Sequence, residues 1–107
     1  MKSFLKTRKA INFDLSENLL KKYYPSKNYR NSWREIKKFL EKSDFIHRQY
    51  SGYVSRKCIP MADVLNIITE MAIKLKWLKL CVIEFDVTIV GNNYSLISHI
   101  YNANFDI

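Results

Sequence analysis

Apolar and polar residues alternate along residues 9–15 of the 107-residue chain. One face of this stretch carries Ile11, Phe13 and Leu15, and the other carries Asn12 and Asp14. An alternation with a period of two predicts a half-buried β-strand that packs its apolar face into a core. Asp14 then lies at the end of a first strand, where a carboxylate can take part in chemistry or can simply end the strand as a turn former.

Two later stretches follow a helical pattern instead. Residues 27–42 place apolar side chains at helical spacing, at Tyr29, Trp33, Ile36 and Leu40. Residues 60–76 form a second helix, with Pro60 at its first position and Asp63 in its first turn. Between the first strand and the first helix, Ser16 can cap a short helical turn that Pro25 closes.

Three further strands are predicted. Residues 44–50 and 52–58 form two of them, joined at the turn dipeptide Ser51-Gly52. Residues 80–88 form the last strand after a turn at 77–79, with Ile83, Phe85 and Val87 on one face and Glu84 and Asp86 on the other. A turn is expected at 91–93, and residues 94–107 fit either a short strand or a helix.

The order strand, helix, strand, strand, helix, strand predicts an α+β, ferredoxin-like fold, βαββαβ, with an antiparallel sheet and both helices on one face. The first and last strands are expected to be central neighbours, which places Asp14 beside Glu84 and Asp86 on the open face. These carboxylates either hold a divalent cation such as Mg²⁺, with Asp14 and Asp86 as ligands, or form a solvated polar face. Stacking of two sheets in a homodimer would also cover this face.

Length and composition fit one globular domain over residues 1–107, with an N-terminal extension at 1–8 and a C-terminal segment at 91–107. The chain is 48% hydrophobic and 14% aromatic, which excludes a disordered protein. No apolar run approaches the roughly 20 residues that span a bilayer, and the N-terminus does not have the apolar centre of a secretory signal. A cytoplasmic protein is therefore expected, with Cys58 and Cys81 reduced and buried.

The net charge of +8 is concentrated in the N-terminal part of the chain. Residues 1–38 contain eleven Lys and Arg and three acidic residues, whereas residues 39–107 are balanced. This distribution fits either a surface that binds a polyanion such as nucleic acid, or a solvated surface that keeps a small protein in solution.

Four segments in register resemble the virulence-associated protein D family over residues 8–94. They are Lys9–Leu15 (KAINFDL), Trp33–Leu40 (WREIKKFL), Phe45–Tyr53 (FIHRQYSGY), and Trp77-Leu78 together with Phe85–Thr88 (FDVT). The resemblance implies a small cytoplasmic bacterial endoribonuclease, often the toxin of a toxin–antitoxin pair, that works as a homodimer and is countered by a cognate antitoxin protein. It also implies that Asp14, which closes the first strand, is the residue tied to cleavage. The family segment Gln-Gly-Ser-x-Tyr matches Gln49, Ser51 and Tyr53, with Tyr50 where the family has glycine.

The remaining site residues are assigned by chemistry. RNA cleavage needs help for the attacking oxygen, neutralisation of charge at the phosphate and a stabilised leaving group. Asp14 could act as base or metal ligand, and His47 is either a proton donor or a packing residue. The candidate RNA-binding residues, each with a structural alternative, are Arg34, Lys37, Lys38, Arg48, Gln49, Ser51 and Tyr53.

Two classes of function are therefore predicted. The first is an endoribonuclease. The alternative is a non-catalytic homodimeric module of the same fold that binds protein or nucleic acid. In both, the dimer is expected to form through the open sheet face and the C-terminal segment.

Overall fold

Eight helices and strands follow one another in the computed structural model, which describes residues 7–49 and 51–91. In chain order they are β1 (Arg8–Leu15), α1 (Glu17–Tyr23), α2 (Asn31–Lys42), β2 (Phe45–His47), β3 (Gly52–Ser55), α3 (Met61–Lys74), α4 (Leu78–Cys81) and β4 (Val82–Val90). The described helices include none that is long and apolar enough to cross a membrane.

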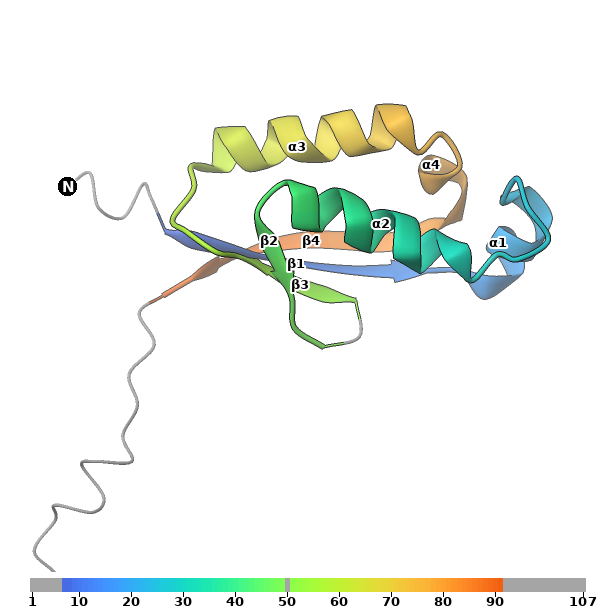
Figure 1. Cartoon of the computed structure of the whole chain (residues 1–107), viewed down its shortest axis with the longest axis horizontal. Coiled ribbons are helices and arrows are strands. Elements are labelled where there is room, and N and C mark those ends of the chain that lie inside the picture. The colour runs from blue at the N-terminus through green and yellow to red at the C-terminus, as the bar shows by residue number, and fades with distance from the viewer. Residues whose placement is uncertain (1–6, 50, 92–107) are drawn as a thin grey trace, which may run out of the picture.

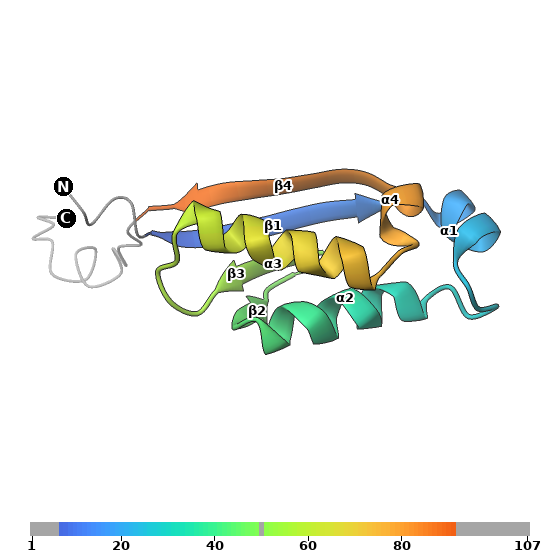
Figure 2. The ribbon, with the colours of Figure 1, turned by 90° about the horizontal axis from the view of Figure 1, so that it is seen from above.

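The four strands form one sheet in the order β2-β3-β1-β4, and every neighbouring pair is antiparallel. Helices α2 and α3 cover one face of this sheet (Figures 1 and 2). The predicted ferredoxin-like fold is thereby confirmed, and β1 does pair with β4. The expectation that β4 is a central strand is wrong: β1 and β3 are central, and β4 lies at the edge of the described sheet.

The core lies between the sheet and these two helices. Ile11, Phe13 and Leu15 of β1 are buried there, as the alternation predicts. The ring of Phe13 stacks between Tyr53 of β3 and Phe85 of β4, with centroid distances of 6.1 and 5.7 Å. Helices α2 and α3 add the buried side chains Ile36, Leu40, Val64 and Met71. One face of β1 is therefore committed to packing, which leaves its other face for the site.

The helical turn expected after Ser16 is present as α1, and the Ser16 hydroxyl accepts a hydrogen bond from the backbone N–H of Leu19 at 3.2 Å. Helix α2 begins at Asn31 rather than near residue 27, and β2 and β3 are shorter than predicted. Leu80 and Cys81, expected in a strand, belong to the short helix α4. One helical turn suits this stretch because Leu78 and Cys81, three residues apart, are both buried where the chain turns from α3 into β4.

The register of β1 and β4 shifts at the end of β1. Asp14 pairs with Glu84, whereas Leu15 pairs with Val82, so Ile83 is an extra residue in β4. Such a bulge bends the strand and turns side chains relative to regular pairing. Ile83 is accordingly exposed instead of sharing the core face with Phe85 and Val87, as the alternation had predicted.

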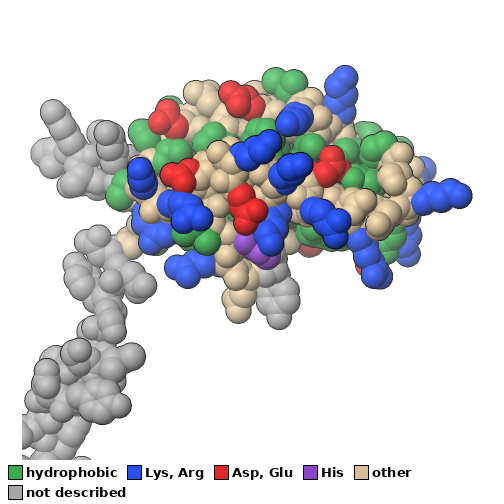
Figure 3. All heavy atoms as spheres, viewed as in Figure 1, with side chains coloured by type: hydrophobic (Ala, Val, Ile, Leu, Met, Phe, Trp, Pro, Cys, Tyr) green, Lys and Arg blue, Asp and Glu red, His purple; other side chains and the backbone are tan. Residues whose placement is uncertain are grey.

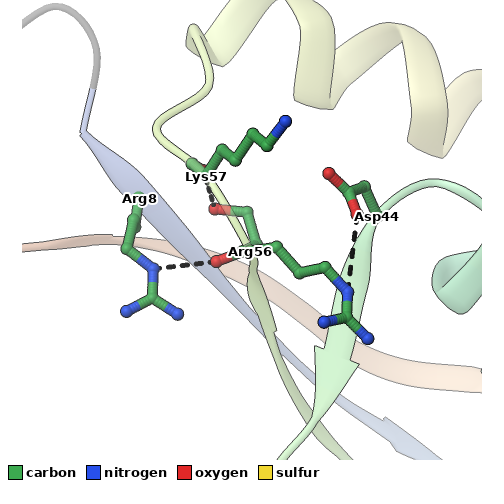
Figure 4. Close-up of polar contacts among 5 residues, drawn as sticks. Arg8, Asp44, Arg56 and Lys57 are labelled. Carbon is green, nitrogen blue, oxygen red and sulfur yellow. Dashed lines mark hydrogen bonds and ion pairs between the residues drawn. The ribbon is translucent and has the colours of Figure 1, made fainter.

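Polar contacts join the start of β1 to the end of β3 (Figure 4). The Arg8 guanidinium donates from Nε to the Ser55 carbonyl at 2.9 Å, and Arg56 forms an ion pair with Asp44 at 3.4 Å. Asp44 ends the turn between α2 and β2 with φ of 69°, a left-handed conformation that Asp tolerates better than most residues. Arg8, expected in an N-terminal extension, is therefore part of the sheet.

Lys9 is a charged residue inside the fold, 2% exposed. Its ammonium donates to the Thr7 carbonyl, the Thr7 hydroxyl and the Ile59 carbonyl at 2.9, 2.8 and 2.7 Å. Three neutral acceptors thus satisfy the three donors of the buried ammonium. They also tie the Thr7–Ile59 bridge to the start of β1.

The two cysteines differ in their exposure to solvent. Cys81 is buried and burial raises the pKa of its thiol, whereas Cys58 is exposed, so its predicted burial is wrong; both are free thiols. Tyr50 and residues 92–107 lie outside the described residues, as do residues 1–6.

Candidate functional site

The end of β1 and the β2–β3 connection enclose a hollow of about 490 Å³ on the sheet. Its lining residues are Asn12, Phe13, Asp14, Arg48, Gln49, Ser51 and Gly52. Asp14 is exposed, and four of the other lining residues, Arg48, Gln49, Ser51 and Gly52, come from more than thirty positions further along the chain. Asp14, Arg48, Gln49 and Ser51, each predicted as a site residue, are therefore brought together, and the volume is in the range of small-ligand pockets.

Backbone hydrogen bonds fix the loop that carries Arg48 and Gln49. The N–H of Arg48 donates to the Gly52 carbonyl, and the N–H of Gly52 donates to the Gln49 carbonyl, both at 2.8 Å. Arg48 and Gln49 are exposed, and among the described residues the Arg48 guanidinium has no ion-pair partner. The hollow thus combines one carboxylate with one available guanidinium, a group suited to bind phosphate oxygens.

Further carboxylates lie on the same open face. Glu84 is directly opposite Asp14 in the register, and Asp86 is opposite Asn12, so Asp86 is only a diagonal neighbour of Asp14. Like charges placed directly opposite each other repel. Among the described residues no group of three or more His, Cys, Asp and Glu side chains is arranged to hold a metal ion. The carboxylate nearest to Asp14 in register is Glu84 rather than the predicted Asp86.

His47 and Tyr53 belong to the opposite face of the sheet. They pair with each other across β2 and β3, and their rings stack at 4.7 Å. Tyr53 also pairs with the buried Ile11 and is only 4% exposed, so it is a core residue. Its burial, together with the nearby charge of Glu41, raises the Tyr53 pKa to about 12. The structure therefore does not bring His47 or Tyr53 into the hollow that contains Asp14.

The predicted RNA-binding residues of α2 lie in the helix layer. Arg34, Lys37 and Lys38 are exposed, and none of them lines the hollow. Figure 3 shows basic side chains spread over the α2 side of the molecule, with acidic side chains among them. An RNA that touched both α2 and Asp14 would have to pass around the β2 edge of the sheet.

The basic connection between α1 and α2 is held by two tyrosine–glutamate pairs. The Tyr24 hydroxyl donates to the Glu35 carboxylate, and the Tyr29 hydroxyl donates to Glu17 at 2.5 Å. Burial and then the Glu35 contact raise the pKa of Tyr24 to about 12. The ring of Tyr24 also meets Trp77 edge-on at 5.2 Å, which connects this segment to α4.

A second hollow, of about 550 Å³, lies along α3 and α4. Its lining residues are Ile68, Thr69, Ala72, Ile73, Lys76 and Lys79. On the same helix Leu65 is 56% and Ile73 68% exposed, so α3 presents apolar side chains to solvent as well as to the core. Exposed apolar side chains that share a surface are a feature of protein-binding sites.

Asn12 and Gly52 are site residues that the sequence interpretation did not assign. Asn12 pairs with Gly52, and a Cβ atom at position 52 would lie 3.1 Å from the Asn12 Oδ1 atom. The alternation along β1 already placed Asn12 on the face of Asp14. The close contact with Gly52, in contrast, depends on the register and could not be read from the sequence.

No protein-family model matches the chain. It is similar to a curated protein named Endoribonuclease VapD 2, from Riemerella anatipestifer. The two are 25% identical over 88 residues, which cover 82% of this chain and 94% of the relative. This similarity therefore extends over nearly the whole length of the relative.

Proposed function

We propose that this chain is a cytoplasmic endoribonuclease of the virulence-associated protein D family, and that Asp14 is its catalytic residue. The observation that carries the proposal is the exposed Asp14 at the end of β1, gathered in one hollow with Arg48, Gln49 and Ser51. The name of the curated relative supports the same reaction class.

In the proposed reaction Asp14 accepts the proton of the oxygen that attacks the phosphorus atom. The guanidinium of Arg48 neutralises charge on the phosphate oxygens, and the side chains of Gln49 and Ser51 offer hydrogen bonds to the phosphate or the sugar. His47 packs on Tyr53 on the other sheet face, so we assign it no proton transfer in this hollow. The leaving oxygen takes its proton from water.

Asp14→Asn tests the proposal because it keeps size and hydrogen bonding but removes the charge. The matched control is Asp63→Asn, the same chemical change on the exposed first turn of α3. With a labelled single-stranded RNA, Asp14→Asn is expected to lose about 10²- to 10⁴-fold in cleavage rate, the usual contribution of a positioned base. Full activity in Asp14→Asn would refute the catalytic assignment.

A divalent cation is a separate part of the proposal. Asp14 with Glu84 or Asp86 would supply two carboxylates, which is fewer than a complete protein site for Mg²⁺. Titration of Mg²⁺ into an assay of chelator-treated protein tests whether cleavage needs the ion. Cleavage that is independent of both chelator and Mg²⁺ would remove the cation from the proposal.

We further propose a homodimer that uses the open sheet face. Sedimentation at micromolar concentration should then give twice the 12.8 kDa chain mass. This face contains the hollow of Asp14 and carries the guanidinium of Arg48 as well as the carboxylates Asp14, Glu84 and Asp86, so the mass should be measured at both low and high salt. A monomer at every salt concentration would contradict this mode of assembly.

As the toxin of a toxin–antitoxin pair, the protein would also bind an antitoxin protein. The apolar hollow on α3 supports a protein partner. The test is co-expression with the product of an adjacent small open reading frame, which should relieve growth arrest. Ile73→Asp should prevent that relief while RNA cleavage continues.

A non-catalytic nucleic-acid-binding protein is the second candidate, and the exposed basic residues of α2 favour it. A salt-sensitive shift of RNA by the wild-type protein, with no cleavage under any condition, would support this candidate over the endoribonuclease.

A further inference from the structure

Asn12 lines the hollow of Asp14 and carries a neutral carboxamide that the proposed reaction does not use. We infer that this carboxamide reads the edge of a nucleobase next to the phosphate on which Asp14 acts. The inference rests on the proposed function and extends it from cleavage to base selection.

The carboxamide of Asn12 lies close to the backbone of β3. Asn12 faces Gly52 across the β1–β3 pair, and a Cβ atom at residue 52 would lie 3.1 Å both from Asn12 Oδ1 and from the Gln49 carbonyl oxygen. A Cβ atom at this position would require the carboxamide and the loop backbone to shift by a few tenths of an ångström. The absence of a side chain at Gly52 therefore leaves room for the Asn12 head group beside the β3 backbone.

The carboxamide is also available. Asn12 is exposed, and among the described residues its side chain has no hydrogen-bond partner. A carboxamide presents a donor and an acceptor side by side, the pattern that pairs with base edges. A second carboxamide, that of Gln49, lines the same hollow.

The spacing of Asn12 and Asp14 along β1 allows one to contact a base and the other to act at the phosphate. Residues two apart on one strand lie about 6.5–7 Å apart, so Asn12 and Asp14 can contact neighbouring parts of the same bound RNA strand. Bases of single-stranded RNA expose their edges and are the usual targets of sequence-specific recognition.

To test this inference, a single-stranded RNA library with a randomised segment is cleaved and the ends of the products are sequenced. The sequences give the base frequencies around each cleavage position. A good amide–base pair discriminates by 1–3 kcal/mol, or roughly 5- to 150-fold. Asn12→Ala should reduce such a preference to less than about twofold at one position. Asn12→Asp, which exchanges the donor for an acceptor and adds charge, should change the preferred base there.

A second set of variants distinguishes base recognition by Asn12 from a purely structural role of this residue. Gly52→Ala should displace Asn12 and lower both the melting temperature and the base preference. The double variant Asn12→Ala/Gly52→Ala removes the contact with the carboxamide but keeps the contact with the Gln49 carbonyl, so it should regain part of the thermal stability without regaining the preference. If the double variant regains both, Asn12 acts only in packing and the inference is overturned.

The other outcomes are equally decisive. A wild-type protein that cleaves RNA with a preference unchanged in Asn12→Ala would overturn this inference alone. A wild-type protein that cleaves no RNA would overturn the proposed function and the inference with it.

Discussion

The two faces of β1 differ in almost every physical property, although they alternate residue by residue. Ile11, Phe13 and Leu15 are buried against helices, whereas Asn12 and Asp14 are exposed beside the loop that carries Arg48 and Gln49. The strand gives the polar face a rigid position because the apolar face is packed. Residues that act on a ligand are placed most accurately when a scaffold holds their neighbours in this way.

The same comparison separates the predicted site residues. Asp14, Arg48, Gln49 and Ser51 meet on the open face, and His47 and Tyr53 stack on the helix-covered face. Closeness in sequence is therefore a poor guide here, since His47 and Arg48 are adjacent but belong to different environments. Substitutions on the helix-covered face should affect the free energy of unfolding, and substitutions on the open face should affect RNA cleavage.

The largest expected effect is on the free energy of unfolding when a side chain of the packed face is truncated. Phe13→Ala removes a ring that stacks on both Tyr53 and Phe85 and should cost about 3–5 kcal/mol. Asp14→Ala, one residue along, should cost about 1 kcal/mol or less, as at other exposed sites. Urea denaturation of both variants measures the contrast, and equal losses would show that the two faces are not energetically distinct.

Alkaline pH should weaken the packed face through Tyr53. Its pKa is raised from 10.0 to about 12, so between these values the unfolded chain releases a proton that the folded chain retains. The contribution of Tyr53 to the free energy of unfolding is therefore fully present below pH 10. It is lost as the pH rises towards 12, by on the order of 2 kcal/mol.

Denaturation curves at pH 9 and pH 11.5 measure this loss, with Tyr53→Phe as the comparison. The variant should show a shallower decline over that window. Because Tyr24 has a raised pKa as well, some loss of stability at alkaline pH should persist in the Tyr53→Phe variant. An unchanged pH dependence in Tyr53→Phe would assign the loss to other groups.

Reversing charges on α2 tests whether RNA extends beyond the hollow. Lys37→Glu/Lys38→Glu should weaken RNA binding roughly tenfold and lower the slope of log affinity against log salt by about 1.4, or 0.7 for each lost phosphate contact. Lys76→Glu/Lys79→Glu makes the same charge change beside the α3 hollow and is the matched control. Equal effects of both pairs would indicate a general charge effect rather than an RNA path over α2.

The smallest effect is expected for His47. His47→Gln should change the cleavage rate by less than about threefold, because its ring lies on the face opposite Asp14 and a group that transfers no proton contributes none of the usual 10²-fold or more. A loss as large as that of Asp14→Asn would restore His47 as the proton donor. It would also imply that the β2–β3 loop moves when RNA binds.

Much of the fold could be predicted because local patterns agree with the packing. The period-two alternation of 9–15 and the helical spacing of Trp33, Ile36 and Leu40 determine which faces are buried, and the order of elements then limits the topology. The alternation in 45–47 could also have placed His47 with the buried Phe45, on the face away from Asp14.

Other features depend on contacts that a local pattern does not encode. An extra residue such as Ile83 leaves the alternation of β4 unchanged in the sequence and becomes visible only as a shift against β1. Leu80 and Cys81 are apolar and fit a strand as well as a helical turn. The hollow itself joins residues 12–14 to residues 48–52, and only the pairing of β1 with β3 brings them together.

Buried Lys9 has a consequence for chemical labelling. Amine-reactive reagents modify lysines that reach water, and the Lys9 ammonium is enclosed by three oxygen acceptors in a residue that is 2% exposed. Its acylation would therefore require the Thr7–Ile59 bridge to open, while exposed lysines such as Lys37 react at once. The rate at which Lys9 becomes modified thus reports, at a single atom, how often the start of the central strand comes loose.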